Sequence, residues 1–596
     1  MATSAILAPV LNTIEVGFTA LVPVSLILFT HQRALNPLYG SYPTSYSLDT
    51  VVSVAIFASV VKPFRIEKSW NWLAAALVLS IAPNASHWIA VWTARAKWVV
   101  LGPALAHAAV VAPLVFLFTN FVSQSGAPAS QHRLLRAAAT YFITKSLTQK
   151  VLPKVSYLNQ VSESQIFLAL AGAAFSAFIL CLDFHTRPAK TKKKVKEPTP
   201  KTSFSPVQIK GAVFIAFTAF WYIVSPQLAN PVLPHPLKET FTHPTGRLQI
   251  HSSVQSVTGL IVVGETLPPL HGEEDPMHSA RYLRADHSLL GGTWMRDRAV
   301  ALDDEPFVVD AFGTKLGDTV YSTFVLQEAA RLVNSTEAGK TGKWNNALAI
   351  GLGTGLSATA FIRHGLNTTI VEIDPAVYDA ARTWFGLPDP GPGNVFLEDA
   401  RGWVERRSQK VQAGVEKNLY DIVVHDCFSG GGVPEHIFTT EFWDSLEKTM
   451  EKEGVLVVNF AGIINSESSR MVLNTLEQSF KQCRAFHDWM QPLEDDQYNT
   501  EFINMVLFCT NSKAPLTFRK PKRSDYLGSH LRKHMFQGLA MREVNLDAVR
   551  VQDPEEVKRY ILTDDVNPLG KLQKSQGLHH WAVMREVLRD EHWETY

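Results

Sequence analysis

Carboxylates recur directly after short apolar runs in the C-terminal half of this 596-residue chain. Four of them are Glu372, Asp374, Asp399 and Asp426. The carboxyl ends of parallel strands meet at one edge of an open α/β sheet, and ligands bind at that edge. If each apolar run is a strand, these acids line one cleft.

A glycine-rich turn precedes the first of these acids. Gly351, Gly353 and Gly355 alternate with Leu352 and Thr354 after the apolar run 347–350. Glycines permit a tight turn and a close backbone approach to a ligand, and the following helix offers free N–H groups and a positive dipole end. A carboxylate about 20 residues further on accepts hydrogen bonds from ribose hydroxyls. The spacing from this turn to Glu372 therefore predicts an adenosine-containing ligand.

The other acids receive roles from their positions in the pattern. We expect Asp399, with Ala400, beside the adenine, and Asp426 where a transferred group sits. Each has a structural alternative: Glu372 as an acid facing a helix dipole, Asp399 as an N-cap, and Asp426 as a cap or turn acid. The same turn also suits the pyrophosphate of NAD. The run Val-Glu-Ile-Asp-Pro at 371–375 favours a sulfonium nucleoside.

The chain after Pro236 alternates apolar runs of strand length with amphipathic segments, which predicts an α/β domain. The expected strands of the main sheet are 347–350, 369–373, 394–397, 420–425, 455–460, 482–487 and 502–509. Helices are expected at 320–333 and 440–453, and the strands 248–255, 258–264 and 281–286 indicate a small β-rich lobe. The predicted fold class is a Rossmann-like domain of the class I methyltransferase type at 340–596, preceded by the β lobe at 245–335.

The N-terminal half, 1–228, is predicted to be an α-helical, multi-pass membrane domain. Crossing the hydrocarbon core takes about 20 mostly apolar residues. Five or six spans are expected among 16–30, 50–61, 70–93, 98–122, 166–182 and 211–228. The alternative is a soluble all-α domain with buried helices. The Lys/Pro-rich segment 185–210 is expected to be a linker, and 132–154 is a basic amphipathic helix or a solvated loop helix.

The core of the C-terminal half, 347–462, resembles the spermidine synthase superfamily. Three motifs match its core in order: Val-Glu-Ile-Asp-Pro at 371–375, Leu-Glu-Asp-Ala at 397–400 and Tyr-Asp-Ile-Val-Val-His-Asp at 420–426. Upstream, Ser-Ser-Val-Gln at 252–255 resembles the family's entry strand. The resemblance spans roughly 246–593 and implies binding of S-adenosylmethionine or its decarboxylated form. It also implies nucleoside-binding or active-site roles for Gln255, Glu372, Asp399 and Asp426, and a homodimer, since superfamily relatives are often dimers.

Three positions depart from the synthases that transfer aminopropyl groups to polyamines. Thr354 and Ser429 stand where those enzymes carry aspartates, and the segment 317–323 loses acids on both sides of Tyr321. A desolvated ammonium needs carboxylate partners, so these losses favour methyl transfer. Asp426 is then expected to orient or deprotonate an acceptor amine on a small molecule or a protein. The alternatives are a polyamine aminopropyltransferase, and a transporter or scaffold whose C-terminal domain is a nucleoside sensor without turnover.

The net charge and the positions of the cysteines limit the partners and the compartment that are compatible with this sequence. The net charge of +1 argues against bulk attraction to nucleic acid. The four cysteines show neither metal nor disulfide spacing, so we expect no metal and a reducing compartment for the C-terminal half. The positive-inside rule places the lysines of 190–196 in the cytosol. A single crossing at 211–228 then puts the C-terminal domain on the opposite face, whereas a supply of S-adenosylmethionine favours the cytosol. We expect a cytosolic catalytic domain, with 211–228 re-entrant or interfacial, or with one of the two rules failing here.

Overall fold

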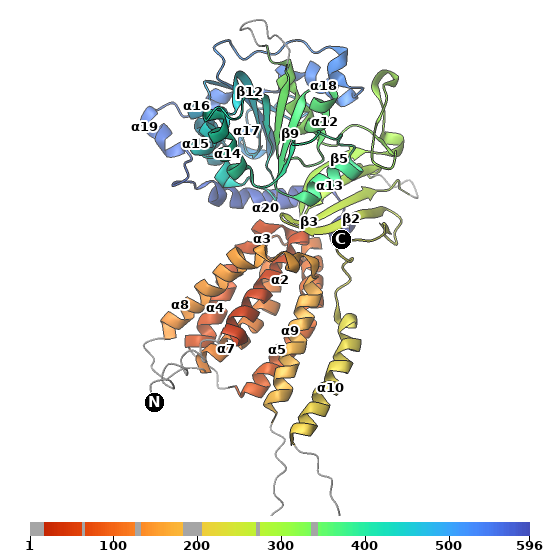
Figure 1. Cartoon of the computed structure of the whole chain (residues 1–596), viewed down its shortest axis with the longest axis vertical. Coiled ribbons are helices and arrows are strands. Elements are labelled where there is room, and N and C mark those ends of the chain that lie inside the picture. Colours follow the sequence, from red (N-terminus) through yellow and green to blue (C-terminus); the bar gives the residue numbers. More distant parts are fainter. Residues whose placement is uncertain are drawn as a thin grey trace, which may run out of the picture. The chain divides into compact units, whose positions relative to one another are not determined.

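The computed structural model describes residues 17–61, 66–124, 133–182, 206–269, 275–334, 344–428 and 430–596. The chain divides into two compact units, a helical unit over Met1–Val232 and a mixed α/β unit over Leu233–Tyr596 (Figure 1).

The helical unit is built from helices that pack around an apolar core. They are α2 (Val22–Tyr39), α3 (Ser41–Tyr46), α4 (Leu48–Val61), α5 (Lys68–Arg95), α6 (Leu101–Ala106), α7 (Ala112–Gln124), α8 (Arg133–Ser146), α9 (Glu163–Cys181) and α10 (Pro206–Val224). The core includes Ile27 of α2, Leu79 of α5 and Phe118 of α7, each at most 2% exposed.

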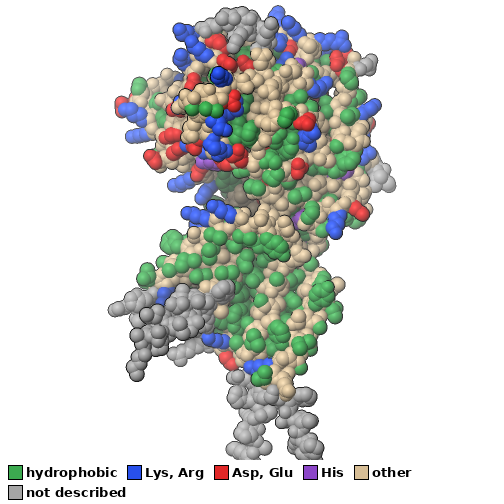
Figure 2. Space-filling model, in the orientation of Figure 1, with side chains coloured by type: hydrophobic (Ala, Val, Ile, Leu, Met, Phe, Trp, Pro, Cys, Tyr) green, Lys and Arg blue, Asp and Glu red, His purple; other side chains and the backbone are tan. Residues whose placement is uncertain are grey.

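Five helical segments of the described part of this unit are long and apolar enough to cross a membrane. They are Ser41–Val61, Lys68–Arg95, Leu101–Val122, Glu163–Cys181 and Val207–Leu228. Figure 2 shows hydrophobic side chains gathered on the outer surface of the unit as well. Examples are Trp70, Ile81, Trp92, Ile215 and Tyr222, all more than half exposed. Apolar residues on both the inner and outer faces of a helix bundle are typical of membrane spans.

The α/β unit contains an eight-stranded sheet in the order β10-β9-β8-β11-β12-β14-β13-β15. Its strands are β8 (Asn346–Ile350), β9 (Asn367–Glu372), β10 (Val395–Leu397), β11 (Tyr420–His425), β12 (Met450–Gly462), β13 (Gln482–His487), β14 (Ile503–Thr510) and β15 (Glu543–Val544). The strands from β10 to β12 are parallel, while β14 runs antiparallel between β12 and β13. The strand order reverses at β8, so the switch point lies between β8 and β11, where a doubly wound sheet binds its ligand.

A second sheet, antiparallel and five-stranded, forms the β lobe. Its strands are β1 (Phe241–Thr242), β2 (Leu248–Ser256), β3 (Gly259–Thr266), β4 (Ala280–Ala285) and β5 (Ser288–Trp294). The sequence prediction missed β5, whose two glycines, Gly291 and Gly292, interrupt its apolar pattern. The close approach of other chain segments to both glycines explains them, since a Cβ at Gly292 would lie 2.7 Å from a carbonyl oxygen of β4.

The predicted helices differ from the structure at their ends. The segment expected at 440–453 is helical only as α15 (Thr440–Glu447), because β12 already begins at Met450. The segment expected at 320–333 forms the short helix α11 (Thr323–Glu328), which continues as a 3-10 turn to Leu332. A short helix here places polar side chains of α11 over the sheet edge described below.

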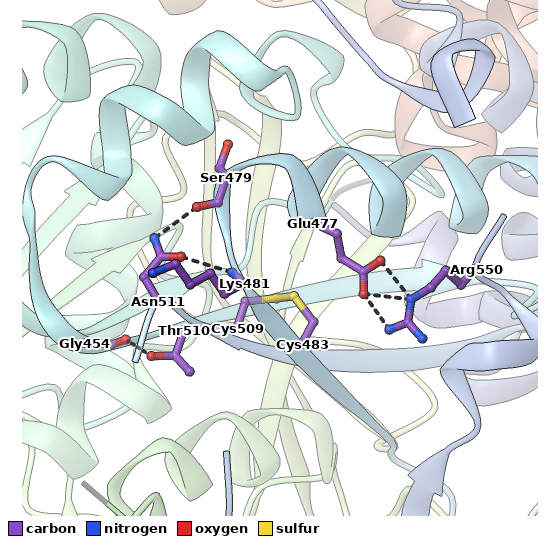
Figure 3. The surroundings of a disulfide bond; sticks show 9 residues. All are labelled: Gly454, Glu477, Ser479, Lys481, Cys483, Cys509, Thr510, Asn511 and Arg550. Atoms are coloured by element: carbon purple, nitrogen blue, oxygen red, sulfur yellow. Dashed lines mark hydrogen bonds and ion pairs between the residues drawn. A yellow bond between two sulfur atoms is a disulfide. The ribbon is translucent and has the colours of Figure 1, made fainter. Parts of the chain in front are cut away.

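A disulfide joins Cys483 of β13 to Cys509 of β14 (Figure 3). The two residues are direct partners in the antiparallel register, although 26 positions separate them along the chain. The expectation of no disulfide was therefore wrong. The pairing follows from strand register, which the cysteine spacing alone does not reveal. Around the bond, Glu477 and Arg550 form an ion pair at 2.6 Å.

Candidate active site

The glycine turn and Glu372 meet at the end of β8. Glu372 accepts hydrogen bonds from the backbone N–H groups of Leu352 (2.8 Å) and Asp374 (2.9 Å). Burial raises the pKa of this carboxyl to about 7, although the two N–H groups favour its charged form. Gly351 and Gly355 both have positive φ, and Gly355 precedes helix α12 (Leu356–Arg363). A Cβ at Gly351 would lie 2.1 Å from the carbonyl oxygen of Asp426, so this turn and the end of β11 are in close contact.

Asp426 lies at the carboxyl end of β11 and is held by two amides. Asn459 of β12 donates to one carboxylate oxygen at 2.9 Å, and Gln327 of α11 donates to the other at 2.6 Å. The carbonyl of Gln327 in turn accepts from the hydroxyl of Ser357 at 2.6 Å. Burial raises the pKa of Asp426, while the two amides oppose that rise. The acid is thus fixed in orientation and remains partly accessible.

Cys427 follows Asp426 at the end of β11 and approaches the glycine turn. Its sulfur would lie 3.2 Å from a Cβ on Gly351, at the start of the glycine turn. Burial raises the pKa of this thiol well above its ordinary value, and nearby negative charges raise it further. Those charges belong to Glu372, Asp426 and Asp399. These contacts place Glu372 and the end of β11 beside the glycine turn, while Asp399 contributes to the electrostatic environment of the thiol.

Asp399 follows β10 and caps the N-terminus of a helix, as its structural alternative predicts. One of its oxygens accepts from the backbone N–H of Arg401 at 2.8 Å and caps helix α14 (Ala400–Gln412), whose first residue is the buried Ala400. Its other oxygen contacts the His436 ring at 2.8 Å. The side chain stays 44% exposed, which leaves it open to a ligand.

Asp374 has a structural role, because its carboxylate accepts hydrogen bonds from other parts of the fold. Its carboxylate is fully buried and accepts from the Ser256 hydroxyl (2.5 Å) and from the backbone and hydroxyl of Thr258 (2.9 and 2.7 Å). It also caps helix α13 (Pro375–Trp384) through the N–H of Ala376 at 2.9 Å. The side chain predicted to bind cofactor therefore ties the β2–β3 turn to the Rossmann domain. Gln255 lies at the end of β2 next to this turn, half-buried.

The sequence prediction missed the polar residues that face these acids from neighbouring elements. Besides Gln327 and Asn459, a further carboxylate, Asp488, follows β13. It accepts from the Thr323 hydroxyl at 2.6 Å and from the Asn504 amide at 2.9 Å. Burial raises its pKa. Its position after a strand is the same signal that identified Asp399 and Asp426, but the strand assignment at 482–487 was not followed to its end.

The sheet order and the acids at its switch point define a class I methyltransferase-type Rossmann domain. Within it, residues 332–509 match the spermine/spermidine synthase domain family.

Curated relatives include both methyl- and aminopropyltransferases. The N-terminal histidine N-methyltransferase of Emericella nidulans is 38% identical over 321 residues, which cover 53% of this chain and 54% of the relative. A polyamine aminopropyltransferase of Vibrio vulnificus is 36% identical over 114 residues, 19% of this chain and 36% of the relative. The chain thus spans about half the length of these relatives or less. A crystal structure of a probable spermidine synthase from Corynebacterium glutamicum has a TM-score of 0.33 at 13% identity, covering 53% of this chain and 96% of that one.

Proposed function

We propose that the chain is a membrane-anchored, S-adenosylmethionine-dependent methyltransferase whose acceptor is a nitrogen of an N-terminal histidine on a protein. The observation that supports the proposal is the contact of Glu372 and of the end of β11 at Asp426 with the glycine turn, with the partly exposed Asp399 following the neighbouring strand β10; we expect an adenosine to bind between these acids. The acceptor class rests on the similarity to the Emericella nidulans N-methyltransferase over 321 residues.

The reaction is an in-line displacement at the sulfonium. The lone pair of the acceptor nitrogen forms the new N–C bond, and the C–S bond breaks with its electron pair remaining on sulfur as a thioether. The proton released from the methylated nitrogen group passes to Asp426 or to water. The protein contributes mainly orientation and exclusion of water. Asn459 and Gln327 fix the Asp426 carboxylate, so it can align a hydrogen on the acceptor without rotating.

Acids that the resemblance implies for a polyamine site are replaced at three places in this sequence. Thr354, in the glycine turn, is buried and carries no charge, and the neighbours of Tyr321 on both sides are neutral. Ser429, the third of the departures, lies outside the described residues. A polyamine has several ammonium groups, and each needs a compensating partner once it leaves water. This difference favours methyl transfer over aminopropyl transfer.

The test uses the full chain in detergent with S-adenosylmethionine and a peptide that begins with histidine. Mass spectrometry should show one added methyl group on the first residue, and none when another residue replaces histidine. Asp426→Asn should lower turnover at least tenfold with donor affinity retained, whereas the exposed Asp495→Asn serves as a matched control. Aminopropylation of putrescine from decarboxylated S-adenosylmethionine, without peptide methylation, would overturn the proposal in favour of polyamine synthesis.

We also infer that the helical unit crosses a membrane and that the α/β unit lies on the side opposite the cytosol. Disulfides persist in oxidising compartments, and the Cys483–Cys509 bond lies within the α/β unit. The lysines of 190–196 favour the cytosol, and the candidate span Val207–Leu228 follows them. Both arguments oppose a cytosolic catalytic domain. Protease added to sealed microsomes should spare the α/β unit until detergent is added. Its digestion in intact vesicles would refute this orientation.

A further inference from the structure

A second carboxylate, Asp488, is held by the same helix as Asp426. Each acid receives one hydrogen bond from α11 and one from an asparagine of the sheet. On α11, Thr323 binds Asp488 and Gln327 binds Asp426. Residues four apart lie on the same face of a helix, so one face of α11 holds both carboxylates.

The two asparagines confirm that the acids share one face of the sheet. Asn459 of β12 pairs with Val506 of β14, and Ala461 pairs with Asn504. Residues two apart on a strand point to the same side, and cross-strand partners do as well. Asn459 and Asn504 are therefore diagonal neighbours on one face, about 7–8 Å apart. The acids that they bind, Asp426 and Asp488, are therefore held at the same face of the sheet.

The surroundings of Asp488 contain a polar group that a ligand can satisfy. The hydroxyl of Tyr321 is buried and has no hydrogen-bond partner among the described residues. Tyr321 directly precedes Ser322, whose hydroxyl donates to the backbone carbonyl of Asp488 at 2.8 Å. Buried hydroxyls are rarely left unpaired in folded proteins, so we expect the Tyr321 hydroxyl to form a hydrogen bond with a bound ligand. Asp488 itself is surrounded by protein and yet keeps accessible surface.

We propose that Asp488, together with Tyr321, binds the free α-ammonium group of the acceptor and so determines its specificity for the chain terminus. This inference rests on the proposed function. An α-amino group has a pKa of about 7.7–8.0 and is mostly protonated at neutral pH, while an imidazole with a pKa of about 6.5 is mostly neutral. The cation needs a carboxylate when it leaves water. The neutral ring nitrogen has the free lone pair that displacement requires, and it faces Asp426, which adjoins the glycine turn and the donor.

The experiment compares two peptides that differ only in the α-amino group: one begins with histidine and the other with its des-amino analogue. The wild-type full chain should favour the free amine by about tenfold or more in kcat/KM, an effect of about 1.4 kcal/mol. Asp488→Asn should bring that ratio close to one, mainly by raising KM, with donor affinity unchanged. Asp495→Asn should keep the wild-type ratio.

Tyr321→Phe keeps the test decisive if Asp488→Asn fails to fold, since its hydroxyl has no partner in the described protein to lose. It should lower the preference for the free amine by severalfold and leave the melting temperature in place. An unchanged preference in the folded variants overturns the inference, and so does methylation of the α-nitrogen located by fragmentation. Failure of the proposed function looks different, because the wild-type chain then methylates neither peptide.

Discussion

Donor affinity should depend on pH through Glu372. The pKa of this carboxyl is raised to about 7 by burial in the unligated protein. Ribose hydroxyls donate to the ionised form, so binding requires that form and weakens as pH falls through 7. With a pKa of about 7, the ionised fraction drops from about nine-tenths at pH 8 to about one-tenth at pH 6. The affinity for S-adenosylmethionine should therefore fall about tenfold over this interval, or about 1.4 kcal/mol.

Isothermal titration calorimetry on the full chain in detergent, at pH 6, 7 and 8, measures this directly. The variant Glu372→Gln provides the control, because it cannot ionise. Its donor affinity should be weaker than that of the wild type at pH 8 and nearly independent of pH. An affinity of the wild type that stays flat between pH 6 and pH 8 would refute the reasoning. A slope that persists in Glu372→Gln would assign the titration to another group.

Three further substitutions distinguish residues that bind the donor from residues that stabilise the fold. Gly351→Ala should abolish donor binding measured by calorimetry, because its Cβ would lie 2.1 Å from the carbonyl oxygen of Asp426; retained binding would contradict the close contact. Asp374→Ala should lower the free energy of unfolding in urea by about 3 kcal/mol, because it strands buried donors, and should leave the donor affinity of the folded fraction unchanged. Replacing Cys483 and Cys509 by alanine opens a 26-residue loop and should cost about 3 kcal/mol by the same assay. Equal stability with and without a reductant would argue against this bond.

The periodic features of the chain could be read from its sequence, and features that depend on register could not. Apolar runs marked β8 to β12, because parallel strands buried in a sheet are nearly continuous apolar segments, and acids at the ends of β9, β10 and β11 strengthened the assignment. The β5 strand escaped detection since its glycines reflect packing against other strands. The disulfide escaped for the same reason, because the antiparallel register of β13 and β14, and not cysteine spacing, brings its two residues together.

The candidate site likewise contains some residues that the sequence predicts and others that only the structure reveals. Glu372, Asp399 and Asp426 could be chosen because each follows its own strand, a local signal. Gln327 and Asn459, which hold Asp426, come from a helix and a strand with no motif of their own. Asp374 shows the opposite case: it follows a strand and precedes a helix, as a ligand acid does, but its partners on the β2–β3 turn lie more than 100 positions earlier. Only tertiary structure reveals that its oxygens are already occupied.

The position of Asp374 also bears on how fragments of this protein should be cut. The family match begins at residue 332, and a fragment starting there would omit the β2–β3 turn and leave this buried carboxylate without three of its four donors. The same cut would remove Gln327. The recognisable domain is therefore smaller than the cooperative folding unit, and expression trials should begin upstream of the antiparallel lobe.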